Sequence, residues 1–357
     1  MIVETPFRAS TTLVSCVNVR RGQRYGLSKK PAGWNVSSIG ESVLLSESRS
    51  LLVCPRCRAE LDWLETEARC TACGRLYPVH AGIVELLTDV DAHKAEQATF
   101  HDEEADTAYE TSRPHDTPRF YRWLFEEKFR RGLGALGSLS SMTALTVCGG
   151  SGMDAEFLAQ AGARVLTADI SPRAAERARE RGRRYNVEIE SIVADVEQLP
   201  FRDRSVDLVF VHDGLHHLVD PFLGLKEIAR VARRAVSINE PSKAIITRAA
   251  THFGLALEQE EAGNRVARLD LDEVVQMFAE SGFSVVRAER FPMLYRHKAG
   301  VLSRAFSRPL LFEPAKAAYR MSAVIAGRAG NKLTVQAIRT SPSTDDDRRL
   351  FEPAARA

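Results

Sequence analysis

The sequence predicts an α/β protein built on a mostly parallel sheet. Between Ala144 and Arg339, short β-rich apolar runs alternate with amphipathic, helix-like segments. This pattern is typical of parallel strands joined by crossover helices. A glycine-rich loop follows the first run, and later runs end in an acidic residue. Because ligands of parallel sheets bind at the carboxyl ends of the strands, these observations predict a binding site along that edge.

Five strands are expected in the parallel part, each rich in β-branched and apolar residues. A single acid at a strand end is commonly a helix cap or a solvated turn residue. Four acids along one edge favour a binding site instead. The runs cover residues 144–148, 164–169, 188–195, 206–213 and 235–240, and all but the first end in an acid: Asp169, Asp195, Asp213 and Glu240.

Composition is that of an ordinary globular protein. The chain has 357 residues, 44% of them hydrophobic and 27% charged, with a formal net charge of +2. Such a balance indicates neither a nucleic-acid partner nor a membrane. No apolar run approaches the roughly 20 residues that a bilayer requires, and no secretory signal is present at the start. We therefore expect two or three domains and a cytoplasmic location.

Changes in composition divide the chain into five parts. The first is rich in Ser, Arg and Gly and is expected to be a flexible tail, with a targeting leader or an upstream start codon as alternatives. The third has Phe120, Trp123 and Leu124 near helical spacing before Gly132, which predicts a helical lead-in. The expected parts are a tail (1–50), a Cys-rich segment (51–88), the lead-in (91–140), the α/β domain (141–340) and a disordered tail (341–357).

The glycine loop lies in the stretch "VCGGSGMDAEFLA", between the first strand and a helix. Its glycines, Gly149, Gly150 and Gly152, let backbone amides approach a ligand beside a helix N-terminus. Asp169 lies 17 residues beyond Gly152, a spacing that suits ribose hydroxyls. The motif fits a dinucleotide as well as other nucleoside cofactors, and a tight turn without a ligand is a further alternative.

Two C-x-x-C pairs dominate the second part. Cys54 and Cys57 are separated from Cys70 and Cys73 by 12 residues. Four thiolates in this pattern suit tetrahedral Zn²⁺, and a closed four-cysteine site is structural. Disulfides are the alternative, which a cytosolic location disfavours. Since so short a segment has too small a core to fold alone, the metal is expected to stabilise it.

The segments "TADIS", "IVADVEQLPFRDRSVDLVFVHDGLHHLVDP" and "LKEIARVARRAVSINEP" resemble the S-adenosylmethionine-dependent class I methyltransferases, in particular the type 11 group. The resemblance covers about residues 144–290, and "ADVEQLPF" is its strongest marker. It implies a Rossmann-like sheet with a reversed last strand, for which residues 283–291 and 331–339 are the candidates.

The resemblance also implies cofactor contacts. In that family the glycine loop wraps the methionine part of S-adenosylmethionine, the acid after the second strand binds the ribose, and an Asp after the third strand meets the adenine. The sequence departs from the family at Thr146, which replaces an acid, and at Cys148, which replaces a glycine and is expected to fill space. The residues implied are Gly149, Gly150, Gly152, Asp169, Ile170, Asp195, Val196 and Asp213.

The Cys-rich segment has a resemblance of its own. "LLVCPRCRAELDWLETEARCTACGRLYPVHAGIVELL" looks like the small zinc-ribbon partner protein that supports tRNA, rRNA and release-factor methyltransferases. This resemblance implies structural Zn²⁺ and a docking or folding module, with direct substrate contact as the alternative. Ribbons of this kind are also fused to stand-alone methyltransferases, so the segment does not name a substrate.

Methyl transfer to a hydroxyl needs a base. The candidates are His217 and His216, which follow the fourth strand, then His212 and Asp213, although a shaping role for "LHHL" is the alternative. We expect a small-molecule acceptor, methylated on O or N, such as a natural product or a sugar. An RNA or protein methyltransferase guided by the ribbon is the alternative, and a non-catalytic cofactor-binding scaffold is a third.

The acceptor pocket is expected from segments outside the common core. These are the lead-in at 109–128, the segment after the fifth strand and an insertion before the last strand. Polar clusters in the latter two offer recognition groups, although salt bridges and loop solvation are the plain alternative. The clusters are Glu261, Asn264 and Arg265, then Tyr295, Arg296 and His297; the run Arg173, Arg177, Arg179, Arg181, Arg183 and Arg184 is expected to be a solvated helix face.

Overall fold

We describe a computed structural model of the chain, which places residues 44–88, 90–102, 107–244, 267–293 and 297–340. Contacts divide the chain into two units, residues 1–34 and 35–357. Every described residue lies in the second unit. The predicted polar cluster at Glu261, Asn264 and Arg265 lies outside the described residues, as do Tyr295 and Arg296.

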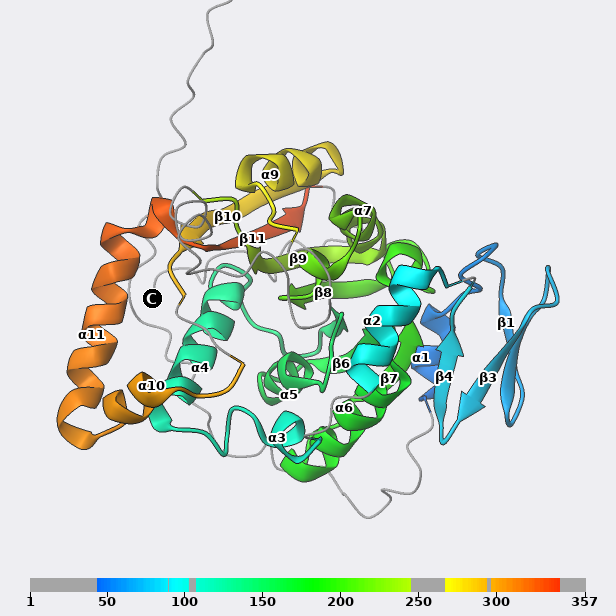
Figure 1. The fold of residues 1–357 in the computed structure, drawn as a ribbon. Helices are drawn as coiled ribbons and strands as arrows, with labels where there is room; N and C mark the ends of the chain where they lie inside the picture. The colour runs from blue at the N-terminus through cyan, green and yellow to red at the C-terminus, as the bar shows by residue number, and fades with distance from the viewer. Residues whose placement is uncertain (1–43, 89, 103–106, 245–266, 294–296, 341–357) are drawn as a thin grey trace, which may run out of the picture. The chain divides into compact units, whose positions relative to one another are not determined.

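The described residues form one mixed sheet of eleven strands in the order β1-β2-β3-β4-β7-β6-β5-β8-β9-β11-β10. Strands β4 to β9 run parallel within it, and β11 runs antiparallel to both β9 and β10 (Figure 1). The predicted α/β fold with a reversed last strand is confirmed. The bounds are β1 Leu61–Trp63, β2 Glu67–Cys70, β3 Leu76–His80, β4 Ile83–Leu86, β5 Thr143–Val147, β6 Arg164–Asp169, β7 Glu190–Ala194, β8 Val206–His212, β9 Ala232–Pro241, β10 Phe283–Phe291 and β11 Lys332–Arg339.

Helices α6, α7 and α9 begin at a side-chain cap that the sequence supplies. Ser171 accepts a hydrogen bond from the amide of Ala174 and is followed by a proline, and Asp220 does the same for the amide of Phe222. Both are preferred N-cap arrangements. The bounds are α1 Ser46–Leu51, α2 Ala92–Asp102, α3 Thr107–Ser112, α4 Arg119–Leu133, α5 Met153–Gln160, α6 Pro172–Tyr185, α7 Pro221–Val231, α9 Leu271–Glu280, α10 Val301–Phe306 and α11 Pro309–Ile325, with 3-10 turns η1 Val196–Gln198, η2 Leu215–His217 and η3 Gly327–Ala329.

Helix α1 begins within the predicted N-terminal tail (1–50), so the predicted end of that tail is corrected. Residues 44–50 were expected in a flexible tail, but Leu44 is buried and Ser48 is fully buried. Ser48 donates a hydrogen bond of 2.7 Å from Oγ to Glu190 at the start of β7. A carboxylate from the sheet therefore holds this segment in place. No helix within the described residues is long and apolar enough to cross a bilayer.

The cysteine-rich ribbon is continuous with the sheet. Strand β4 pairs in parallel with β7 at Glu85↔Val193 and Leu86↔Ala194. Beside this pairing, Val53 donates its amide to the carbonyl of Pro200 at 2.9 Å. The ribbon thus covers the edge of β7, which would otherwise expose unpaired backbone groups. Apolar side chains from both parts share one core, among them Leu52, Tyr77, Leu86, Ile192 and Phe201.

The arginine run of α6 is not a solvated face, and that prediction is wrong for half of it. Arg181 is fully buried, and Arg177 and Arg179 are nearly so, whereas Arg173 and Arg183 are exposed. Arg181 donates from Nη1 to Glu156 at 2.8 Å, and Glu156 is itself fully buried. Burial lowers the pKa of the Arg181 guanidinium, and Glu156 opposes that shift. Arg181 therefore joins α6 to α5 through a buried ion pair.

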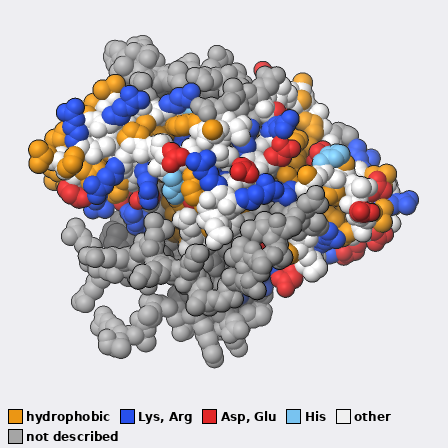
Figure 2. Space-filling view, turned by 90° about the horizontal axis from the view of Figure 1, so that it is seen from below, with side chains coloured by type: hydrophobic (Ala, Val, Ile, Leu, Met, Phe, Trp, Pro, Cys, Tyr) orange, Lys and Arg blue, Asp and Glu red, His pale blue; other side chains and the backbone are white. Residues whose placement is uncertain are grey.

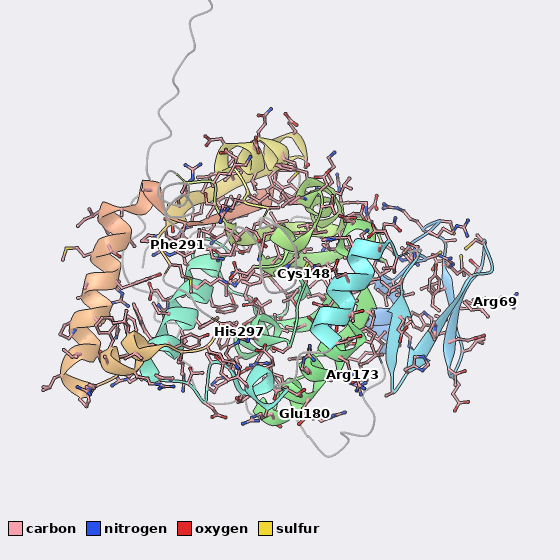
Figure 3. The ribbon with its side chains drawn as sticks, viewed as in Figure 1. Arg69, Cys148, Arg173, Glu180, Phe291 and His297 are labelled. Atoms are coloured by element: carbon pink, nitrogen blue, oxygen red, sulfur yellow. The ribbon has the colours of Figure 1, made fainter. Side chains whose placement is uncertain are left out.

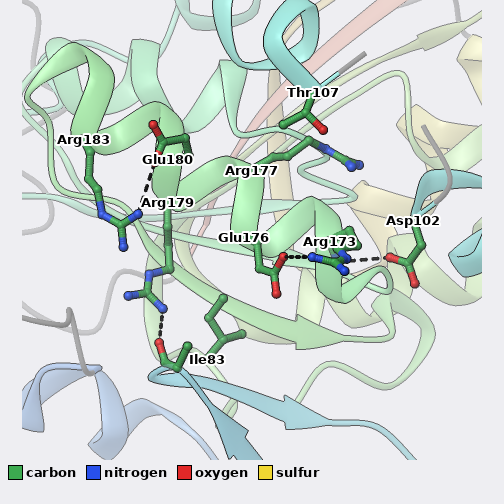
Figure 4. Close-up of a pocket in the computed structure, with 10 residues that line it drawn as sticks. Ile83, Asp102, Thr107, Arg173, Glu176, Arg177, Arg179, Glu180 and Arg183 are labelled. Carbon is green, nitrogen blue, oxygen red and sulfur yellow. Dashed lines mark hydrogen bonds and ion pairs between the residues drawn. The ribbon is translucent and has the colours of Figure 1, made fainter. Parts of the chain in front are cut away.

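The outer side of α6 borders a cavity of about 550 Å³ that lies against the ribbon (Figure 4). Four of its charged side chains form two ion pairs: Arg173 with Glu176 at 3.0 Å, and Arg183 with Glu180 at 3.2 Å. Arg179 donates to the carbonyl of Ala81 in the turn between β3 and β4. We assign this cavity no function.

Candidate cofactor site

The glycine loop connects β5 to α5. Gly152 adopts a φ of +76°, and a side chain there would place its Cβ 2.8 Å from the Cβ of Ala178 on α6. Only glycine fits such a backbone at such a distance. A Cβ on Gly150 would meet nothing within 4 Å, so the backbone of this residue faces open space. The loop is thus closely packed against α6 at Gly152, and its backbone is accessible at Gly150. A loop that binds a cofactor through its backbone requires both properties.

Asp169, the last residue of β6, lies beside this loop. Its Oδ2 accepts a hydrogen bond of 2.8 Å from the amide of Gly150, and its Oδ1 accepts one of 3.0 Å from Ser171. Ile170 follows it, half-buried. Two predicted cofactor residues from different strand ends, Gly150 and Asp169, are therefore in direct contact.

The two departures from the family pattern occupy the end of β5. Thr146 is buried and donates from Oγ1 to the hydroxyl of Thr167 on β6 at 2.7 Å. Cys148 has a φ of +50° and packs against the main core; Figure 3 shows it near the middle of the view. Thr146 thus bonds to the neighbouring strand. The packing of Cys148 agrees with the predicted space-filling role.

Cys148 lies near several carboxylates of the site, and these affect the pKa of its thiol. Burial raises the pKa of its thiol well above the usual value, and nearby carboxylates raise it further. A thiol with a raised pKa is a poor nucleophile. Lys94 pairs with two of these carboxylates and His216 with a third, so the group is largely compensated within the protein. The carboxylates belong to Asp169, Glu240, Asp195 and Glu197.

Asp195 follows β7 and caps η1, accepting from the amide of Glu197 at 2.9 Å. Val196 beside it is buried. Lys94 of α2 reaches this point, with its Nζ 2.6 Å from Asp195 and 2.5 Å from Glu197. Burial alone would lower the pKa of Lys94, but bonds to these two carboxylates raise it. The lead-in helix therefore contributes a cation to the predicted adenine end of the site.

The carboxyl end of β8 carries a second charged group. Asp213 lies between two lysines, with Lys128 Nζ at 2.5 Å and Lys332 on its other oxygen. Lys128 comes from α4 and is only 4% exposed. Burial alone would raise the pKa of Asp213, but the two lysines hold it well below its usual range. Asp213 therefore ties α4 and β11 to the sheet edge, a role that the resemblance did not imply.

The histidines of η2 are positioned by β9. His216 is buried, and its Nδ1 lies 2.9 Å from Glu240, whose other oxygen accepts the amides of Gly214 and Leu215. Because a carboxylate only accepts, the proton of a neutral His216 lies on Nδ1 and the lone pair on Nε2. His217 stacks on it, with 4.2 Å between ring centroids.

Asp213, His216 and Glu240 offer three possible metal ligands within 4.8 Å of one another. Two lysines already compensate Asp213, and Glu240 accepts three hydrogen bonds. A cation placed here would be repelled by Lys128 and Lys332. We therefore regard the cluster as an internally satisfied network rather than as a metal site.

His212, the other histidine candidate, is held at the end of β8. Its Nδ1 lies 3.1 Å from Asp154 of α5, and Asn239 donates to its Nε2 at 2.8 Å. Burial lowers the pKa of His212, which Asp154 only partly opposes. Both ring nitrogens are thus engaged, and a structural role fits His212 better than a catalytic one.

Replacing Asp213 by Asn is expected to reduce the steepness with which the free energy of unfolding falls as pH is lowered. An Asp whose folded pKa is depressed contributes stability above its unfolded pKa of about 4, and that contribution is lost as pH falls through the lower folded pKa. Asn tolerates the φ of +53° at this position. Urea unfolding of the full chain between about pH 6 and pH 3 measures the slope. An unchanged slope in the variant would contradict the lysine clamp.

The structure brings most of the predicted residues to one sheet edge, and it adds several that sequence reasoning missed. Lys94, Lys128 and Lys332 belong to α2, α4 and β11, far apart in the chain. A lysine on an amphipathic helix carries no local sign that it meets an acid elsewhere. His93 was missed for the same reason, and its Nε2 lies 3.0 Å from the carbonyl of His217.

The strand order, the antiparallel β11 and the acids at the carboxyl ends of β6 and β7 are those of a Rossmann-like methyltransferase fold. Comparison with known families agrees. A family model described as "Methyltransferase domain" matches residues 145–237, and one described as "Trm112p-like protein" matches residues 50–82. Residues 145–237 are therefore similar to methyltransferase domains, and residues 50–82 before them are similar to Trm112p-like proteins.

Curated relatives are similar over part of the chain. The demethylmenaquinone methyltransferase of Mycobacterium sp. (strain KMS) is 31% identical over 124 residues, which are 34% of this chain and 51% of the relative. The chain thus spans about half the length of the curated relatives it matches.

Two solved structures are also similar. The magnesium protoporphyrin IX methyltransferase of Synechocystis PCC 6803 has a TM-score of 0.48 and 16% identity, over 70% of this chain and 100% of the other. A complex between the Haloferax volcanii Trm112 methyltransferase activator and a putative methyltransferase has a TM-score of 0.42 and 16% identity, over 71% of this chain and 100% of the other.

Proposed function

We propose that this protein is an S-adenosylmethionine-dependent methyltransferase that acts on a small molecule. The observation that carries the proposal is the contact between Asp169 and the amide of Gly150, at 2.8 Å, beside backbone that faces open space. A carboxylate there suits ribose hydroxyls. The match of residues 145–237 to a family model described as "Methyltransferase domain" supports S-adenosylmethionine over a dinucleotide.

In this proposal Gly149, Gly150 and Gly152 hold the methionine part, Asp169 holds the ribose, and Asp195 with Val196 lies at the adenine. Bound S-adenosylmethionine supplies an electrophilic methyl group. The residues of the chain then mainly align the acceptor with it and exclude water. Asp169 and Asp195 are held in advance by backbone amides, so little ordering is left to binding.

His216 and His217 are the proposed bases if the acceptor loses a proton. Glu240 fixes the ring of His216 with the Nδ1 proton directed toward its carboxylate, which suits a base that acts through Nε2. His217→Ala is expected to lower kcat at least about tenfold while leaving cofactor affinity unchanged. Unchanged turnover would leave His217 with a shaping role only.

The acceptor class rests on two observations that point in different directions. The curated relatives are named for a small-molecule acceptor, demethylmenaquinone, which supports a small organic acceptor here. The Trm112p-like match at residues 50–82 favours the second candidate, an RNA or protein methyltransferase. In this chain the ribbon continues the sheet and shares its core, which supports a folding role and thus the first candidate.

Transfer from tritium-labelled S-adenosylmethionine into fractionated extract of the source cells tests the proposal. We expect label in a low-mass fraction that organic solvent or ion exchange separates from RNA and protein. Label in RNA or protein would favour the second candidate. Absence of label from every fraction, with cofactor binding intact, would contradict methyl transfer.

Asp169→Asn is expected to weaken S-adenosylmethionine binding by roughly 100-fold, because charged hydrogen bonds to two hydroxyls are weakened. Calorimetric titration measures the loss. Asp272→Asn is the matched control, since Asp272 is exposed in the first turn of α9. Equal affinities in both variants would remove Asp169 from the proposed site.

We also propose a structural Zn²⁺ in the ribbon, held by Cys54, Cys57, Cys70 and Cys73. Their sulfur atoms all lie within 4.8 Å of one another. The Cys54–Cys73 and Cys57–Cys70 sulfur distances are 3.8 Å and 3.4 Å. Tetrahedral Zn–S bonds of about 2.3 Å require S–S separations of about 3.8 Å, so the cysteines fit the metal. Their role is to close the ribbon.

A further inference from the structure

The insertion between β10 and β11 carries an apolar face that no described residue covers. Helix α11 packs one side on α4, where Phe312 and Tyr319 meet Phe120 and Trp123. Its opposite side points outward. At 100° per residue, eight residues lie within about 70° of the outward direction, and all are exposed. Glu313, at the edge of that side, is an acid that pairs with Lys316 at 3.0 Å. The other seven are apolar and form a stripe: Leu310, Pro314, Ala317, Ala318, Met321, Val324 and Ile325.

The exposure of the large residues is nearly complete. Leu310 is 90% exposed, Val324 85% and Ile325 79%. Val301 and Leu302 at the start of α10 are 78% and 68% exposed. A helix on the surface of a globular protein normally turns polar residues outward. An exposed apolar stripe of this kind marks a surface that contacts something else.

Basic residues border the apolar stripe. Between His297 and Ile325 the sequence has one acid, Glu313. Lys298, Arg304, Arg308 and Arg320 are exposed. Figure 2 shows orange and blue side chains interspersed at the left of the view, the side on which Figure 1 places α10 and α11. This local excess of basic residues is not apparent from the net charge of the whole chain, which is +2.

The combination is complementary to an anionic lipid surface. Basic amphipathic helices lie in the headgroup region with their apolar side toward the acyl chains. From Leu310 to Ile325 the stripe is about 22 Å long at 1.5 Å per residue, and none of its side chains can form a hydrogen bond. Protein interfaces of that size normally carry several hydrogen bonds, whereas acyl chains need none.

A second copy of the chain fits this face less well. A two-fold contact would bring the basic residues of both copies into one interface, and an excess of like charges in an interface is unfavourable. The residues on either side of α10 are also hydrogen-bonded to α3 and α4. Tyr109 and Tyr121 both donate to the carbonyl of His297 at 2.7 Å, and the amide of Phe120 donates to Ser307 at 2.9 Å. These hydrogen bonds therefore hold the insertion that carries the stripe in a fixed position against α3 and α4.

We propose that α10 and α11 form a docking surface for anionic phospholipid membranes, on which the protein lies without crossing the bilayer. Met321, Val324 and Ile325 enter the interface, and Arg304 and Arg308 contact headgroup phosphates. The proposal is independent of methyl transfer, since it concerns where the protein is held.

Sedimentation of the full chain with vesicles tests the proposal. We expect binding to mixed phosphatidylglycerol and phosphatidylcholine vesicles and little binding to phosphatidylcholine alone. Val324→Glu with Ile325→Glu should reduce partitioning by at least about 30-fold. Arg304→Gln with Arg308→Gln, or about 0.5 M salt, should reduce it roughly tenfold or more.

Leu64→Glu is the matched control, because Leu64 is 52% exposed in the ribbon, and it should bind as the unaltered chain does. Circular dichroism establishes that each variant is folded. Failure of the folded, unaltered chain to bind anionic vesicles would overturn the proposal and leave an acidic protein as the partner. Conversion of a dimer to a monomer by Val324→Glu with Ile325→Glu would also overturn it, in favour of a second copy.

Discussion

Cys57→Ser is expected to release the ribbon's zinc and to lower the thermal midpoint of the whole protein by roughly 3–5 °C, equivalent to about 2–4 kcal/mol for a protein of this size. Cys57 is exposed, so the smaller serine leaves no cavity. The effect reaches beyond the ribbon because β4 pairs with β7, and Leu52, Tyr77 and Leu86 share the core of the sheet. Elemental analysis and scanning calorimetry measure the two effects.

Arg56→Ser is the matched control, since Arg56 is an exposed neighbour within the same C-x-x-C pair. It should retain about one zinc per chain and the original midpoint. Loss of zinc without a change in the midpoint would mean that the ribbon folds separately from the sheet. Retention of zinc in the Cys57 variant would contradict the four-cysteine site.

Arg181→Met is expected to destabilise the protein by about 3–5 kcal/mol, because it leaves the buried carboxylate of Glu156 without its cation. The guanidinium also donates from Nε to the carbonyl of Ser151 at 2.8 Å and to the carbonyls of Glu110 and Arg113. It therefore supports the glycine loop from behind. Urea unfolding measures the loss, and weaker cofactor binding should accompany it.

Arg183→Met tests whether any arginine of α6 would have the same effect. Its side chain is 53% exposed and pairs with an exposed Glu180, so a change within about 0.5 kcal/mol is expected. Combining Arg181→Met with Glu156→Gln should cost less than the sum of the two single changes, since the buried charge is then absent. Additive losses would contradict a direct pair.

Strand positions could be predicted from the sequence because each strand's signal is local. Residues 164–169 and 283–291 form β6 and β10 as predicted, residue for residue. Strand β9 begins at Ala232, earlier than the predicted 235. The residues before Ala235 continue an arginine-rich, helix-like pattern. They are extended because α7 ends at Val231, and Arg233 and Arg234 then pair with Asp207 on β8.

The charge network could not be predicted, since its partners come from distant segments. Arg181 looked like part of a solvated face because Glu156 and Glu110 lie on α5 and α3. Asp213 was predicted as a cofactor residue from its place after a strand, but Lys128 and Lys332 neutralise it. The composition of one helix cannot reveal which of its charges meets a buried partner.

Calorimetric titration of the full, unaltered chain with S-adenosylmethionine tests the central claim most directly. The geometry at Gly150 and Asp169 predicts about one site per chain with a dissociation constant in the range of roughly 1 μM to 1 mM, and no binding of NAD. S-adenosylhomocysteine should bind at the same site. Absence of heat from the folded chain with either sulfur compound, or binding of NAD in their place, would contradict the proposed cofactor.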